Sequence, residues 1–123
     1  MEFLTNRKRA VGLGSAKEGT GHHWRMIVTS VGLLILVPLF VFTVGPMLGQ
    51  PHQAVLNYFS QPFPAIVTAL TFLVGFMHFK SGAQVLIEDY TGGLTRKVLI
   101  LAVICLSYGA AATGLFAIAR IAL

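Results

Sequence analysis

Residues 65–90 read AIVTALTFLVGFMHFKSGAQVLIEDY, and this stretch decides the fold class. Its part from 65 to 87 matches the ~20 apolar residues that an α-helix needs to cross ~30 Å of hydrocarbon. His78 lies near the middle, and Glu88, Asp89 and Tyr90 follow directly after the apolar part. Because an ionisable side chain at membrane depth is costly, the segment predicts a membrane helix that carries a functional site.

Two further apolar segments, 26–48 and 98–119, have a similar length. The chain of 123 residues is 55% hydrophobic and 11% charged, with a mean hydropathy of +0.78. A soluble domain normally has about 25% charged residues. The sequence therefore predicts an all-α membrane protein. Its three transmembrane helices would lie within residues 26–119, between an N-terminal segment 1–25 and a C-terminal end 120–123.

The connections and the charges predict the topology. Residues 45–64 contain four prolines and no Lys or Arg, and 54–59 could form a short interfacial helix; residues 88–97 form the second link, with Gly92-Gly93 ending the helix. Five of the nine basic residues precede the first span. Basic residues flanking spans favour the cytoplasmic side, which predicts an inner-membrane protein with a cytoplasmic N-terminus. The net charge of +5 therefore indicates membrane lipid as the partner, and no nucleic acid.

A run of small residues, 109–114, interrupts the third apolar segment. Small residues let two helix backbones approach closely in membranes. Two interpretations stay open: the run packs against a partner subunit, or it packs the three helices of this chain together.

Helical geometry assigns the residues near His78 to different faces of the predicted helix. At about 100° per residue, Gly82, Val85 and Asp89 share the direction of His78, whereas Lys80 points nearly the opposite way. Gly82 would leave room for a flat ring one turn from the histidine. Lys80 is expected to extend to the cytoplasmic interface.

A histidine in mid-membrane has three interpretations: a hydrogen bond to a neighbouring helix, a proton relay, or ligation of a haem iron. No second histidine of this chain lies at that depth, because His22 and His23 precede the first span and His52 is in the outer link. A six-coordinate haem would therefore need its other ligand from another polypeptide.

Two motifs carry a family resemblance. The run His78-x-x-x-Gly82-x-x-Val85-x-x-Glu88-Asp89-Tyr90 resembles the hydrophobic membrane-anchor subunit of succinate dehydrogenase (complex II), the smaller of its two anchors. Ahead of the first span, the run Gly14-Ser15-Ala16-Lys17-x-Gly19 and then His22-x-Trp24 and Thr29 are similar to alphaproteobacterial anchors. One departure is that Met26-Ile27 stands where such anchors often have Gln-Arg, with an arginine at Arg25 instead.

The resemblance implies a function and its residues. His78 would be an axial ligand of a b-type haem shared with a cytochrome b-type anchor subunit, with Gly82 beside the ring. Tyr90, assisted by Asp89, would bind ubiquinone. The other implied partners are an iron–sulfur subunit and a flavoprotein subunit, so this chain alone would not catalyse succinate oxidation.

Two other classes of protein remain as alternatives. A small multidrug-type transporter would need an acid inside the membrane and four spans, whereas the interiors of these three spans hold none. A structural anchor without a cofactor would need no ligand for iron. A reduced-minus-oxidised spectrum of the purified complex separates the last alternative from the haem-binding anchor.

Overall fold

The chain, as a computed structural model, is described for residues 4–14 and 19–123; Ser15, Ala16 and Lys17 of the N-terminal motif lie outside this range. The elements are α1 (Asn6–Val11), α2 (Gly19–Val44), the short 3-10 helix η1 (Gly45–Met47), α3 (His52–Phe59), α4 (Pro62–Tyr90) and α5 (Gly93–Ala122). Three segments are long and apolar enough to cross a membrane: α2 continued by η1, α4, and α5. Because the described residues also contain no strand, the predicted all-α membrane protein with three transmembrane helices is confirmed.

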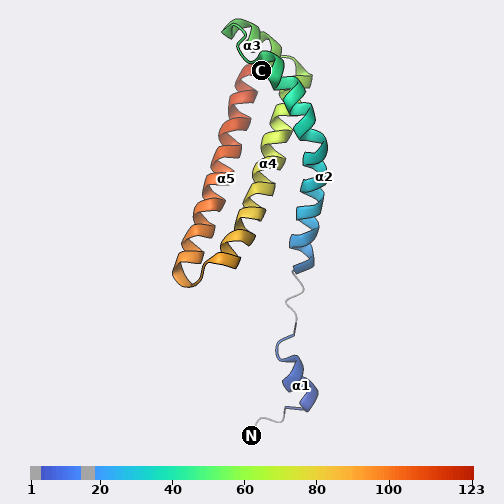
Figure 1. Cartoon of the computed structure of the whole chain (residues 1–123), viewed down its shortest axis with the longest axis vertical. Helices are drawn as coiled ribbons and strands as arrows, with labels where there is room; N and C mark the ends of the chain where they lie inside the picture. Colours follow the sequence, from blue (N-terminus) through green and yellow to red (C-terminus); the bar gives the residue numbers. More distant parts are fainter. Residues whose placement is uncertain (1–3, 15–18) are drawn as a thin grey trace.

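The three long helices lie side by side, with α4 between α2 and α5 and packed against both (Figure 1). The start of α2 and the turn from α4 to α5 lie at one end of this group, which we call the Tyr90 end. Helix α3 and the C-terminus lie at the other end, which we call the α3 end (Figure 1). Different residues of α4 therefore contact α2 and α5.

The group has little interior of its own. The buried apolar side chains are Phe59, Ala65, Val67 and Ala111, and no large side chain of the described residues is fully buried. Large apolar side chains such as Leu34, Phe42 and Leu106 are instead exposed along the helices. These helices therefore cannot be stabilised by a core of their own, and their apolar surfaces suit lipid or partner helices.

The helices are longer than the predicted spans, and the links are correspondingly shorter. The first link contains α3, two residues longer than the short helix predicted at 54–59. The second link, 88–97, was predicted between membrane spans and stays a prediction: α4 continues to Tyr90, and only Thr91 and Gly92 separate it from α5, because helices can extend beyond the spans. Gly93 has φ +60°, which glycine adopts without strain.

The side chain of Arg96 closes this turn. Its Nε donates to the carbonyl oxygen of Thr91 at 2.7 Å, and its Nη2 donates to the same oxygen. The Thr91 hydroxyl donates to the carbonyl of Ile87 at 2.6 Å. Arg96 therefore satisfies the carbonyl of Thr91, the residue that follows α4, and Thr91 satisfies the carbonyl of Ile87 in the last turn of α4.

The small-residue run of α5 divides between two faces. Ala111 is buried, and a Cβ at Gly114 would overlap the ring of Phe72 on α4. Gly109, Ala112 and Thr113 are exposed. One face of the run thus packs α5 on α4, and the other face is left free for a neighbour.

Candidate functional site

His78 lies between α2 and α4. It is half-buried, and its Nδ1 is 2.9 Å from the hydroxyl oxygen of Thr29 on α2. Tyr90 ends α4 twelve residues later, so His78 is about 18 Å from that end along the helix axis. The structure thus bears out the hydrogen bond to a neighbouring helix. This bond occupies only one of the two ring nitrogens.

The Nε2 atom of His78 has no hydrogen-bond partner among the described residues and is not enclosed by protein. Gly82 follows one turn later, and a Cβ placed there would meet only the terminal methyl of Met26, at 4.0 Å. The space beside the histidine is therefore bounded by a flexible side chain. A planar ligand beside Nε2 would have to displace this methyl group.

Lys80 does not extend toward the Tyr90 end, so that expectation was wrong. Its Nζ donates to the hydroxyl of Tyr108 on α5 at 3.4 Å and lies 5.4 Å from the centroid of the same ring. Lys80 and Tyr108 also line a cavity of about 370 Å³ together with Thr29 of α2, so α2, α4 and α5 all border this cavity. The sequence indicated the direction of Lys80 but could not show that a tyrosine of α5 meets it.

Tyr90 and Asp89 lie at the tip of α4. The Tyr90 side chain is 82% exposed, Asp89 is exposed, and the side chains of both lack a hydrogen bond within the described part of the chain. They are not among the residues that line the cleft described next or the cavity at the α3 end.

A cleft of about 620 Å³ at the Tyr90 end was not predicted. Its polar walls come from the start of α2 and the last turns of α4: His22, Arg25, Gln84 and Glu88. Gln84 Nε2 donates to Glu88 Oε1 at 2.8 Å, and the Nε2 of His22 is buried without a partner in the described residues. The spacing of Gln84 and Glu88, four residues apart on one helix face, was the signal in the sequence that could have pointed to it.

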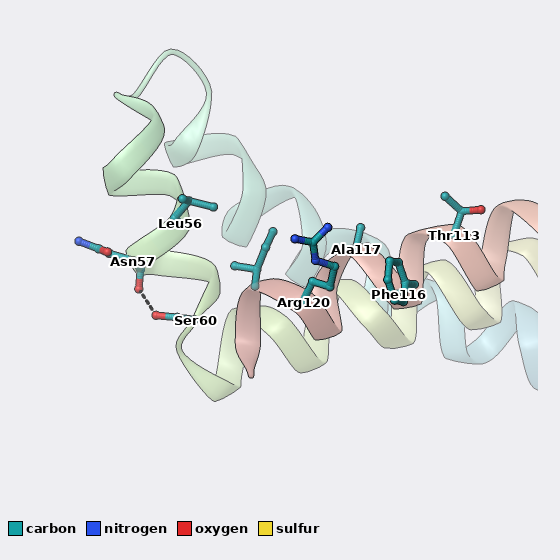
Figure 2. Close-up of a pocket in the computed structure, with 8 residues that line it drawn as sticks. Leu56, Asn57, Ser60, Thr113, Phe116, Ala117 and Arg120 are labelled. Atoms are coloured by element: carbon teal, nitrogen blue, oxygen red, sulfur yellow. Dashed lines mark hydrogen bonds between the residues drawn. The ribbon is translucent and has the colours of Figure 1, made fainter.

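A separate cavity of about 620 Å³ lies at the α3 end, between α3 and the last turns of α5 (Figure 2). Figure 2 shows Asn57 and Ser60 of α3 on one side and Arg120 of α5 on the other. The predicted site residues His78, Gly82, Asp89 and Tyr90 are not among the residues that line it. The cavity at the α3 end is therefore separate from the predicted site.

No group of three or more His, Cys, Asp or Glu side chains is arranged to hold a metal ion in the described ranges 4–14 and 19–123. A metal bound by this chain at His78 would thus depend on further ligands from a cofactor or a second polypeptide. This matches the chemistry of haem iron, which has four ring nitrogens and takes one or two axial ligands from protein.

Comparisons with known proteins agree with this arrangement. The family model described as "Succinate dehydrogenase/Fumarate reductase transmembrane subunit" matches residues 1–115. The succinate dehydrogenase hydrophobic membrane anchor subunit of Paracoccus denitrificans is 44% identical over 123 residues, which cover 100% of this chain and 95% of that protein. No solved structure matches the chain. Because both matches extend over nearly all of the sequence, the chain belongs to the family of succinate dehydrogenase/fumarate reductase transmembrane subunits.

Proposed function

We propose that this chain is the membrane-anchor subunit of a succinate:ubiquinone oxidoreductase, in which it binds a b-type haem together with a cytochrome b-type anchor subunit and contributes to the ubiquinone site. An iron–sulfur subunit and a flavoprotein subunit complete the complex, and this chain is not catalytic for succinate by itself. The complex sits in the bacterial inner membrane with the N-terminus of this chain in the cytoplasm. Family membership and the three long apolar helices support this proposal.

One observation carries the haem assignment: His78 is held on α2 through Nδ1 while its Nε2 is left without a partner among the described residues. A neutral imidazole with one nitrogen bonded to a neighbouring oxygen is the usual form of a histidine that binds metal through the other. The haem, when bound, supplies one-electron redox chemistry. His78 would supply one axial ligand, and the open space at Gly82 would admit the edge of the ring.

The quinone assignment rests on the tip of α4. Reduction of ubiquinone takes two electrons and two protons, and the electrons come from the iron–sulfur partner. The Tyr90 phenol can donate a hydrogen bond to a quinone carbonyl, and the Asp89 carboxylate can accept one from water or a nearby donor. Both side chains are exposed and unpaired within the described residues, so they are free to contact a ligand or partner.

The transporter alternative finds little support in the geometry. The acids of α4, Glu88 and Asp89, are exposed in its last turn, and α2 and α5 contain no acid. A coupling carboxylate inside the membrane is therefore missing from the described helices. The alternative that remains is a structural anchor without haem.

Purification of the membrane complex tests the proposal against that alternative. We expect a reduced-minus-oxidised spectrum with a low-spin b-type band, and loss of this band when the gene for this chain is deleted. A complex that contains this chain, reduces quinone at full rate and shows no haem band would contradict the haem assignment.

A further inference from the structure

We propose that Thr29 is a positioning residue for His78: its hydroxyl oxygen accepts a hydrogen bond from Nδ1–H, keeps Nε2 unprotonated, and thereby sets the reduction potential of the haem. This inference rests on the proposed ligation of haem iron by His78. It adds a residue on a different helix that controls the ligand without touching the iron.

The geometry around Thr29 involves three polar atoms. Its hydroxyl oxygen is 2.9 Å from Nδ1 of His78, 2.8 Å from the carbonyl oxygen of Arg25 and 3.0 Å from the carbonyl oxygen of Met26. Residues 29 and 78 are 49 positions apart in the chain, so this contact connects α2 to α4. Thr29 is half-buried, which keeps the contact largely away from solvent and lipid.

Counting protons links the directions of these bonds. A threonine hydroxyl has one proton, and both carbonyl oxygens can only accept. When the Thr29 proton is donated to the backbone carbonyls, the hydroxyl oxygen is left as an acceptor, and Nδ1 must then carry the ring proton. The neutral ring has only one N–H, so Nε2 keeps its lone pair. This is the tautomer that can bind iron through Nε2.

The opposite arrangement is less favourable for a metal ligand. If Thr29 donated to Nδ1, the ring proton would lie on Nε2 and would block ligation. That N–H would also have no acceptor among the described residues, and a polar group left unpaired in an apolar environment costs free energy. Thr29 therefore favours the ligating form of His78 before any iron binds.

A hydrogen bond from the second ring nitrogen also changes the electronics of a ligand. It raises the basicity of the imidazole and fixes the orientation of the ring. A more basic imidazole stabilises ferric over ferrous iron. Removing the acceptor should therefore raise the reduction potential of the haem.

The test is a redox titration of the haem band in the purified complex. Thr29→Val removes the hydroxyl and keeps the branched side chain, whereas Thr29→Ser keeps the hydroxyl. Ser30→Ala is the matched control, because Ser30 also donates to the Met26 carbonyl, at 2.8 Å, but has no contact with His78. At a fixed applied potential, we expect the ferrous-to-ferric ratio to rise up to about tenfold in Thr29→Val, or about 59 mV for a one-electron couple. Thr29→Ser and Ser30→Ala should titrate like the parent complex.

An unchanged midpoint potential in Thr29→Val would overturn the inference, as would an equal shift in Ser30→Ala. If Thr29→Val does not assemble, Thr29→Ala removes the same hydroxyl without an apolar branch and is titrated instead. The His78→Leu variant distinguishes failure of the inference about Thr29 from failure of the proposed haem ligation. Loss of the haem band in His78→Leu with no shift in Thr29→Val would reject only the role of Thr29.

Discussion

Lys80 of α4 and Tyr108 of α5 form a contact across the helix interface, with Nζ 3.4 Å from the phenol oxygen and 5.4 Å from the ring centroid. Lys80 is half-buried and has no salt bridge to an acid among the described residues. The hydroxyl and the aromatic face thus take the place of a carboxylate as the partner of this cation. The contact also ties α5 to the helix that carries His78.

This contact predicts a graded effect of substitutions at Tyr108. Tyr108→Phe keeps the ring under the ammonium group and should leave the thermal stability of the complex close to that of the parent. Tyr108→Leu removes the ring as well and should destabilise it by about 0.5–2 kcal/mol. The measurement is thermal unfolding of the purified complex. Equal stability of the two variants would contradict a role for the aromatic face.

Gly114 predicts a second effect on the α4–α5 interface. A Cβ at this position would overlap the Phe72 ring, so Gly114→Ala should destabilise the complex by about 1–3 kcal/mol through overpacking. Gly109→Ala is the matched control, because a Cβ there meets nothing within 4 Å in this chain. Thermal unfolding and the amount of assembled complex in membranes are measured for both variants. A larger loss in Gly109→Ala would instead mean that a partner subunit packs closely on that face.

The topology is tested with reporter fusions at Gln53 in α3 and at Gly93 in the turn. The link with no Lys or Arg should lie outside the cytoplasm and the turn with Arg96 and Lys97 inside it. We therefore expect a periplasmic signal at Gln53 and a cytoplasmic signal at Gly93. A cytoplasmic signal at Gln53 would reverse the orientation.

Tyr90→Phe tests the quinone assignment. The substitution keeps the ring and removes one hydrogen-bond donor, worth about 0.5–1.5 kcal/mol and more if the quinone oxygen is left unpaired. Quinone reduction should fall about tenfold, while succinate oxidation with a dye that bypasses the membrane stays near the parent rate. Asp89→Asn should show the same difference between the two assays, to a smaller degree. A wild-type rate of ubiquinone reduction in Tyr90→Phe, with unchanged inhibitor sensitivity, would assign the quinone site to other residues.

The sequence predicted those features that depend on one helix at a time. Apolar length predicted three helices, and the helical period placed Lys80 on the side of α4 opposite to His78. Contacts between helices could not be predicted, because their register depends on how side chains fit together. The contacts of His78 with Thr29 and of Lys80 with Tyr108 are examples. Helix α4 continues past the predicted span to Tyr90, because a helix need not end where its apolar part ends.

The surroundings of the proposed quinone residues could not be predicted either. Tyr90 and Asp89 are exposed at the tip of α4, whereas His22, Arg25 and Glu88 line the cleft at the same end. The sequence places His22 before the first span and Glu88 after the apolar part of α4, and their approach could not be predicted because it depends on the packing of α2 against α4.

The central claim is that His78 ligates haem iron, and the reduced-minus-oxidised spectrum of the His78→Leu complex tests it most directly. Lys80→Leu is the control, because Lys80 lies on the same helix but contacts Tyr108 of α5. The account predicts that His78→Leu abolishes or strongly alters the low-spin b-type spectrum while Lys80→Leu retains it. A normal bis-histidine spectrum in an assembled His78→Leu complex would contradict the claim.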